Sequence, residues 1–135
     1  MTCELCTTPG GAVLWEDQFC RVVEVKEPGY PGFCRVIWKA HVREMTDLDE
    51  VGRRHCMNVV FAVERALRRI LSPAKINLAT LGNMVAHVHW HVIPRFADDP
   101  HFPQPVWGTQ QRDGTPVREG MDKLAQAIRS GLQSC

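Results

Sequence analysis

The sequence lacks any long apolar run, and it carries almost no net charge. No apolar stretch approaches the ~20 residues that a membrane-spanning helix needs. Sixteen Lys and Arg residues against fifteen Asp and Glu residues give a formal net charge of +1, so the bulk charge attracts neither nucleic acid nor an anionic membrane. We therefore expect neither nucleic acid nor a membrane as a partner.

Signal-like, repetitive and linker-like segments are also missing. The first residues, MTCELCTTPGG, lack the basic and apolar parts of a secretory signal, so we expect a cytoplasmic protein. Its 135 residues, 44% of them hydrophobic, fit a single domain spanning residues 1–135, with the core of the domain in residues 3–107. Six cysteines would be mostly reduced there. Three of them lie in apolar patterns and are expected in the core: Cys20, Cys34 and Cys56.

Short apolar segments bounded by turn residues predict a sheet of about five strands. Four strands are expected at residues 13–16, 20–25, 33–38 and 75–81. A Pro- and Gly-rich loop at residues 26–32 and a tight turn at Gly82-Asn83 lie between strands. Because short turns join neighbouring strands, the sheet should be mainly antiparallel.

One long helix is predicted between the third and fourth strands. Thr46 has the side chain of an N-cap, and Ser72-Pro73 marks the end. Apolar residues recur at helical spacing at Leu48, Val51, Met57, Val60, Val63, Leu67, Ile70 and Leu71. A second apolar stripe predicts a C-terminal helix over residues 117–133. A sheet with helices packed on it gives an α+β fold.

The stretch HVHWHVIPR, residues 87–95, places three of the six histidines at every second position. Strict alternation is the signature of a strand, whose side chains point to opposite faces in turn. The set expected to face the core is Val88, Trp90 and Val92. The opposite face would carry the three imidazoles of His87, His89 and His91.

Three aligned imidazoles have two chemical uses. Neutral imidazole is the commonest protein metal ligand, and three histidines can hold a catalytic zinc with an open fourth position. Imidazole is also a good nucleophile at neutral pH and can attack a phosphoryl centre to form a labile P–N intermediate. A neighbouring imidazole can then stabilise the non-bridging oxygens or help the leaving group. The residues alone leave both uses open. A third alternative is that the histidines lie on an edge strand at the surface and have no function.

HVHWHVI resembles the His-φ-His-φ-His-φ-φ signature, with φ an apolar residue, of the histidine triad (HIT) family of nucleotide hydrolases and transferases. The N-terminal Cys-x-x-Cys, the stretch PGYPGFCRVIWKAHV and the Pro-Arg after the triad extend the resemblance to members similar to bacterial diadenosine polyphosphate hydrolases. The resemblance implies a HIT-like fold and a homodimer. It also implies cleavage of a nucleotide, for which we expect a purine nucleotide, at the α-phosphate.

Carried over by position, the resemblance assigns a role to each histidine. His89 matches the nucleophile, His91 the histidine that hydrogen-bonds the phosphate, and His87 the residue that supports the site behind the nucleophile. The implied activity is that of a phosphoanhydride or phosphoramidate hydrolase with a covalent nucleotidyl-histidine intermediate and no metal needed for catalysis. Asn83 and Met84 lie where the family binds the phosphate.

The chain departs from the family pattern at two positions. Many relatives have Ser or Thr, which touches phosphate, where this chain has Met84. Many also have Asp or Asn, which holds the ribose hydroxyls, at the position of Val25. Two alternatives therefore stay open: a nucleotide-binding module with little activity, and a nucleotidyltransferase or phosphorylase on the same scaffold.

The segment Cys3-Glu4-Leu5-Cys6 has the spacing of a zinc knuckle. A tetrahedral site needs two further ligands. Some bacterial family members that this chain resembles pair such cysteines with a histidine after the third strand and with the first triad histidine, here His41 and His87. The resemblance thus implies a structural zinc; the alternative is that the two cysteines simply pack.

The long helical stripe, residues 48–71, has more apolar face than we expect one small sheet to cover. Packing that helix and the strand at residues 75–81 against a symmetry mate would bury the excess, which predicts a homodimer. In such a dimer Trp107 would reach toward the partner's histidines and help to select the substrate.

Overall fold

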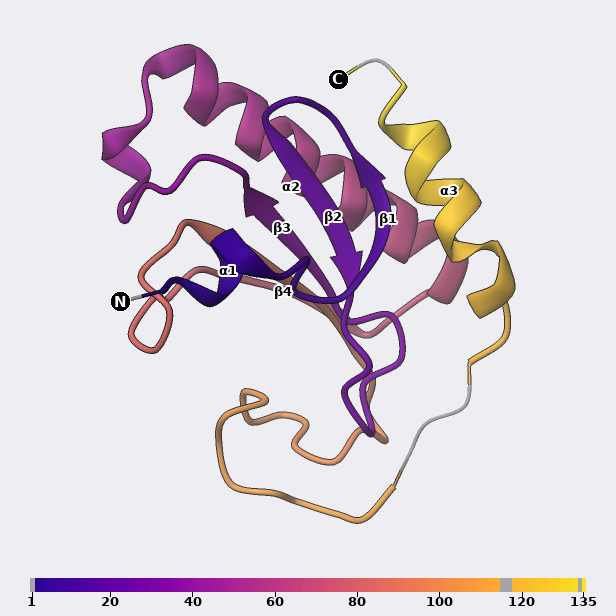
Figure 1. Cartoon of the computed structure of the whole chain (residues 1–135). Helices are drawn as coiled ribbons and strands as arrows, with labels where there is room; N and C mark the ends of the chain where they lie inside the picture. The colour runs from indigo at the N-terminus through magenta and orange to yellow at the C-terminus, as the bar shows by residue number, and fades with distance from the viewer. Residues whose placement is uncertain (1, 115–117, 134) are drawn as a thin grey trace.

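The computed structural model describes residues 2–114, 118–133 and 135. Its strands form one five-stranded sheet in the order β1-β2-β3-β5-β4, in which every neighbouring pair is antiparallel. The strands are β1 (Ala12–Glu16), β2 (Cys20–Glu24), β3 (Cys34–Trp38), β4 (Lys75–Ala79) and β5 (His89–Arg95). The predicted α+β fold with a mainly antiparallel sheet is confirmed (Figure 1).

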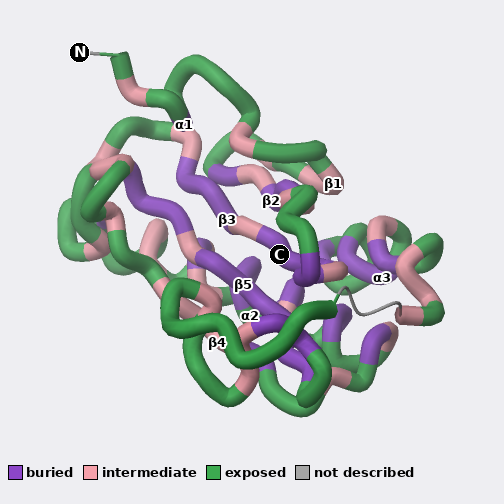
Figure 2. The backbone as a smooth tube through the Cα atoms, turned by 90° about the horizontal axis from the view of Figure 1, so that it is seen from below, coloured by how far each residue is buried: buried purple, intermediate pink, exposed green. Residues whose placement is uncertain are grey.

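Two helices cover one face of this sheet. α2 (Glu50–Leu71) packs on β3 and β5, and α3 (Leu124–Gly131) packs on α2 and β1. The main core lies between these layers, in the purple segments at the centre of Figure 2. A one-turn helix, α1 (Glu4–Thr7), lies on the opposite face, where Leu5 packs against Val23 and Ile37. Among the described residues, no helix is both long and apolar enough to cross a membrane.

The predicted N-cap of the long helix is wrong. Thr46 lies in a 3-10 turn, Met45–Asp47, and α2 begins only after Asp49. Asp49 Oδ1 accepts a hydrogen bond of 2.7 Å from the Gly52 backbone N–H, which satisfies one of the free donors at the helix start. Because Leu48 has an extended backbone, with φ −82° and ψ 148°, the 3-10 turn and the helix are separate elements.

The apolar stripe of α2 is buried within the chain itself. Its buried side chains are Cys56, Val59, Val60, Ala62, Val63, Ala66, Leu67 and Leu71. Ala127 and Ile128 of α3 belong to the same core. The helix face that we expected to need a symmetry mate is therefore covered by α3, and Val51, expected in the stripe, is 72% exposed.

The C-terminal helix is shorter than the predicted range of residues 117–133. α3 covers eight residues and follows a 3-10 turn at Met121–Lys123, while residue 117 lies outside the described residues. Gly120 has φ +89°, a left-handed conformation in which a residue with a side chain is strained. The regular helix therefore begins only after this turn.

A buried ion pair fixes the loop that follows β5. Arg95 donates from Nε and Nη2 to the two carboxylate oxygens of Asp99, at 2.9 and 3.1 Å, and both side chains are almost fully buried. The same carboxylate accepts hydrogen bonds from the backbone N–H groups of Phe96, His101 and Phe102. The first turn of the loop is thereby anchored to the end of the sheet.

Replacing Asp99 by Asn should destabilise the fold by about 3 kcal/mol or more, because the Arg95 guanidinium stays buried without its counter-charge. Burial opposes ionisation of Asp99, but hydrogen bonds from Arg95 and from backbone N–H groups outweigh it and lower the carboxyl pKa. The stabilisation is thus complete above a pH of about 4, and it is lost as the pH falls through the lowered pKa.

Urea unfolding of the wild type and Asp99→Asn at pH 7 and at pH 3 measures this difference. Glu50→Gln is the control, because it breaks the exposed Glu50–Arg54 pair and should change the free energy of unfolding by less than ~1 kcal/mol. Equal stability of the wild type and Asp99→Asn at pH 7 would show that the pair does not stabilise the fold.

Candidate functional site

His89 and His91 lie on β5 and face away from the main core. Their ring centroids are 5.1 Å apart and their planes are at 83°. Trp90, between them, packs against the main core, and its Nε1–H donates to Met45 Sδ at 3.4 Å. The side chains therefore alternate as the sequence indicates, with two imidazoles on one face and the indole on the other.

The first histidine is held differently from the other two. β5 begins at His89, and His87 lies in the segment before it, with its ring 1% exposed. Its Nε2–H donates to the carbonyl oxygen of Trp38 at 2.5 Å, so Nδ1 carries the lone pair. That nitrogen lies 3.4 Å from Cys3 Sγ. The His87 ring thus faces the N-terminal segment, which lies on the same side of the sheet as His89 and His91.

The tautomer of His89 follows from one hydrogen bond. Its Nδ1 lies 2.6 Å from the backbone oxygen of His87. A carbonyl oxygen only accepts, so Nδ1 carries a proton, and in the neutral tautomer Nε2 carries the lone pair. The side chain is almost buried, with 9% exposure. The hydrogen bond thus holds the orientation of the His89 ring.

His91 is a buried neutral imidazole. Desolvation, helped by His89 and Arg35, lowers its pKa to about 4. Its ring meets Phe33 edge-on, with centroids 5.7 Å apart, and Trp107, with centroids 5.3 Å apart. Its buried Nδ1 has no hydrogen-bond partner among the residues that the structure describes. His91 Nδ1 can therefore still form a hydrogen bond to a ligand, and near pH 7 the ring does so without a positive charge.

A cavity of about 430 Å³ opens beside these two histidines. Its walls are the loop of residues 81–85, Leu5 near the N-terminus, and Trp107. Asn83 and Met84, expected at the phosphate, lie in that loop, and Met84 is 96% exposed. Trp107 lies against His91 of its own chain, instead of extending toward a partner as we expected. The contact of these residues with a substrate stays a prediction.

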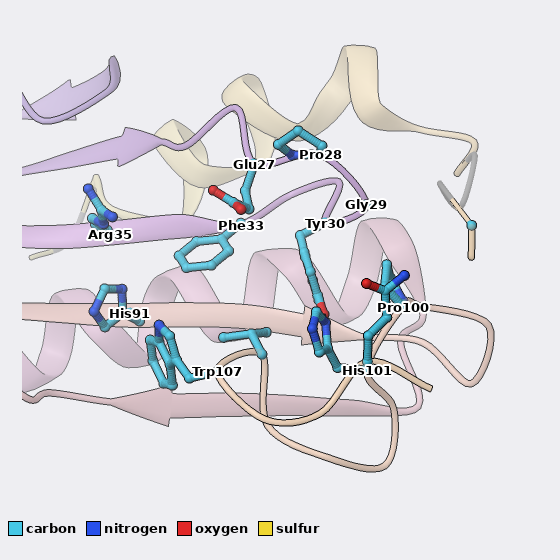
Figure 3. A pocket seen from close by; sticks show the side chains of 13 residues that line it. Glu27, Pro28, Gly29, Tyr30, Phe33, Arg35, His91, Pro100, His101 and Trp107 are labelled. Atoms are coloured by element: carbon cyan, nitrogen blue, oxygen red, sulfur yellow. The ribbon is translucent and has the colours of Figure 1, made fainter. Parts of the chain in front are cut away.

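A second cavity, of about 330 Å³, adjoins the first and was missed by the sequence reasoning. Figure 3 shows Tyr30 and His101 at one end of it, and Arg35 with His91 at the other. The sequence does carry one signal for it, since Arg35 is a charged residue inside the otherwise apolar strand FCRVIW. The loop positions of Tyr30 and His101 have no such signal, because they depend on tertiary packing.

Cys3, Cys6, His41 and His87 converge at the edge of the site, with all four ligand atoms within 4.8 Å of one another. The Sγ···Nδ1 distances are 3.4 to 3.5 Å, and the two Nδ1 atoms are 3.2 Å apart. Zn–S bonds of ~2.3 Å and Zn–N bonds of ~2.05 Å at tetrahedral angles require about 3.5 Å and about 3.3 Å for these pairs. The donor set and its spacing therefore fit a tetrahedral zinc ion.

The comparisons with known proteins agree with this geometry. A family model described as HIT domain matches residues 10–98. The chain belongs to the HIT domain family. An uncharacterized HIT-like protein of Borreliella burgdorferi is 28% identical to it over 106 residues, which cover 60% of this chain and 76% of that protein.

Solved structures of the same family share the fold. A histidine triad protein from Bradyrhizobium japonicum is 29% identical, with a TM-score of 0.75 over 92% of each chain. One from Marinobacter aquaeolei is 25% identical, with a TM-score of 0.75 over 98% of this chain and 96% of that chain. A Zn-bound histidine triad family protein from Mycobacterium smegmatis is 20% identical, with a TM-score of 0.63 over 98% of this chain and 94% of that chain.

Purified protein expressed with supplemented metal should carry about one zinc per chain, and Cys3→Ser should lose it, because a closed site needs four ligands. Elemental analysis measures the content, and thermal melting should show a lower midpoint for Cys3→Ser. The control is Cys135→Ser, which removes an exposed thiol outside the cluster and should keep the zinc. Wild-type protein without zinc after that expression would reject the site.

Proposed function

We propose that the protein is a nucleotide phosphoanhydride or phosphoramidate hydrolase that acts at the α-phosphate through a covalent nucleotidyl-His89 intermediate. The observation that carries this proposal is the 2.6 Å hydrogen bond from His89 Nδ1–H to the His87 carbonyl oxygen, which assigns Nε2 as the nitrogen with the lone pair in the neutral imidazole. Membership of the HIT domain family supports nucleotide chemistry at these residues. The candidate bacterial diadenosine polyphosphate hydrolase activity is the most specific form of the proposal.

The reaction divides into two displacements at phosphorus. In the first, the Nε2 lone pair of His89 forms a P–N bond while the bond from phosphorus to the leaving group breaks, and the leaving group takes that electron pair. In the second, water attacks the phosphorus, the P–N bond breaks and Nε2 recovers its lone pair. An amine leaving group takes a proton from solvent in the first displacement, and the proton that the attacking water loses in the second passes to solvent. No metal ion takes part in these steps.

The surrounding residues would bind the nucleotide. His91, 5.1 Å from His89 between ring centroids, is placed to donate a hydrogen bond to a non-bridging oxygen. Trp107, 57% exposed at the cavity wall, offers an aromatic face for a base, which suits the expected purine. Asn83, in the loop that lines the same cavity, adds a side-chain amide.

We also propose that a zinc ion held by the Cys3, Cys6, His41 and His87 set is structural. The Zn-bound family relative from Mycobacterium smegmatis and the donor spacing support this role. All four ligands come from the protein, so no position is open for a substrate. Such an ion would fix the N-terminal segment, and with it Leu5 of the cavity wall.

One observation favours a nucleotide-binding module with little activity as the second candidate. Met84 stands in the loop that borders the cavity, 96% exposed, and its thioether cannot donate the hydrogen bond that a hydroxyl offers to phosphate. A transferase or phosphorylase differs from the hydrolase only in the acceptor of the second displacement. Turnover assays with and without inorganic phosphate separate the three.

His89→Ala should lower turnover by ~10⁴-fold or more while the substrate still binds, because the mutant has no atom to form the P–N bond. The measurement is steady-state hydrolysis of diadenosine tetraphosphate, with binding followed by calorimetry. His55→Ala on α2 is the matched control, because that ring lies outside both cavities. A mutant with more than a tenth of the wild-type rate would rule out the covalent scheme.

A homodimer is a further part of the proposal. Because α3 already covers the apolar face of α2, the dimer interface would instead form at the β4 edge of the sheet. β4 is an outer strand, so one row of its backbone groups is free to pair with a second chain. Stable interfaces of this kind bury roughly 2,000 Å² or more. Light scattering at micromolar concentration should give twice the 15.3 kDa of one chain. A monomer mass would contradict the dimer and leave the chemistry untouched.

A further inference from the structure

The two cysteines of the N-terminal segment are open to small solutes, unlike those of the sheet and of α2. Cys6 is exposed and Cys3 is partly exposed, whereas the three cysteines in β2, β3 and α2 are fully buried. A cavity of about 560 Å³ has Cys3 in its wall, so an oxidant in the solvent reaches this sulfur without any opening of the core. Cys135 is also exposed, but it lies at the other end of the chain, beside Asn58 of α2.

The sulfur atoms of Cys3 and Cys6 lie close enough to react with each other. Both are 3.4 to 3.5 Å from Nδ1 of His87, and they lie within 4.8 Å of one another. Their residues bound a single turn, in which the Cys6 N–H donates to the Cys3 carbonyl oxygen at 3.1 Å. Such a turn keeps its first and fourth Cα atoms within roughly 7 Å, and a disulfide needs roughly 4.4 to 6.8 Å. A bond between the two sulfurs therefore requires only local movement.

We propose that Cys3 and Cys6 are a site of reversible oxidation, at which a peroxide converts the two zinc-binding thiols into a disulfide and releases the ion. This inference rests on the zinc site proposed above and does not depend on the hydrolysis. In the reducing compartment that the sequence predicts, such a disulfide is transient, and transient disulfides there are usually catalytic or redox-sensing.

The oxidation balances with one peroxide molecule per chain. One sulfur attacks a peroxide oxygen, the O–O bond breaks, and the thiol proton leaves with the departing oxygen as water, which gives a sulfenic acid. The second sulfur attacks the sulfenic sulfur, the S–O bond breaks, and the second thiol proton completes another water. The two sulfurs lose two electrons and the peroxide gains them. A dithiol reductant reverses the bond by thiol–disulfide exchange.

The disulfide and the zinc ion exclude each other. The thiolate is the form of cysteine that binds a metal, so a bond between the sulfurs removes two of the four ligands. His41 and His87 remain, and two imidazoles do not complete a closed tetrahedral site. Release of the ion therefore accompanies formation of the bond.

The oxidation acts on one end of the N-terminal segment and leaves the other end in place. The guanidinium of β2 residue Arg21 donates, at 2.8 to 3.0 Å, to the backbone oxygens of Leu5, Thr8 and Pro9. These contacts involve no sulfur, so the fold should persist in the oxidised protein. His87 Nδ1, in contrast, loses its thiolate neighbours and the ion. Because the His87 carbonyl oxygen holds the His89 ring, the redox state of the segment reaches the site.

The sequence makes a direct test possible, because Glu4 separates the two cysteines. A glutamate-specific protease should give residues 1–4 and residues 5–16, each with one cysteine. Zinc-loaded full-length protein is treated with hydrogen peroxide, its free thiols are alkylated, and it is denatured and digested. Mass spectrometry should find the two peptides joined, and dithiothreitol added before alkylation should part them. A chromogenic chelator should detect about one zinc ion released per chain over the same time course.

Cys135→Ser is the matched control, because it removes the other exposed thiol and should give the same joined peptides and the same zinc release. Separate peptides after peroxide treatment, or joined peptides with the zinc retained, would overturn the inference. Failure of zinc to rebind after reduction would refute its reversibility. Wild type purified without zinc fails the zinc proposal instead, and the linkage of the two peptides then decides alone whether this is an oxidation site. None of these measurements uses a substrate, so they stand apart from the test of the hydrolysis.

Discussion

His87 is held at three points, and each point belongs to a different part of the molecule. Its Nε2–H is bonded to Trp38 of β3, and its Nδ1 lies among the sulfur atoms of the N-terminal segment. Its backbone oxygen accepts the Nδ1–H of His89. The tautomer of His89 therefore depends on the carbonyl of His87, a residue whose ring is held by β3 and by the cysteine cluster. A shift of the N-terminal segment would therefore move the His87 ring, and with it the His87 carbonyl oxygen that holds His89.

The opposite wall of the site is fixed by a separate interaction. The buried pair of Arg95 and Asp99 closes the turn after β5, and Arg95 Nη2 also donates to the backbone oxygen of Gln104 at 2.7 Å. The chain then returns to place Trp107 against His91. The indole in turn keeps His91 away from water, which contributes to the low pKa of that ring. Packing of the loop and protonation of the site are thus physically linked.

The sequence predicted the strands and the alternation of β5 because each of these depends on local spacing. That Trp90 faces the core and His89 faces the other side follows directly from period two. The N-cap at Asp49 in place of Thr46 was missed because both residues suit a cap, and only the extended Leu48 between them decides.

The place of Arg35 and the hydrogen bond of His87 were missed for a different reason. Both depend on partners distant in the chain: the register of β3 against β5 places Arg35 beside His91, and the Trp38 carbonyl accepts from His87 Nε2–H. Single-sequence spacing contains no information on such partners. The family resemblance implied roles for the histidines, but it assigned none to the position of Arg35.

The charge distribution in the site explains why such an arginine is useful. A protonated imidazole is the obvious counter-ion for phosphate, yet burial and the nearby His89 and Arg35 hold the His91 pKa at about 4. Two imidazoles with centroids 5.1 Å apart in a desolvated place oppose each other's protonation, and a protonated His89 would have no lone pair for attack. Positive charge near a bound phosphate must therefore come from a group that is charged at neutral pH without taking up a proton, and a guanidinium is such a group. The place of Arg35 on β3, the strand next to β5, separates this fixed charge from His89.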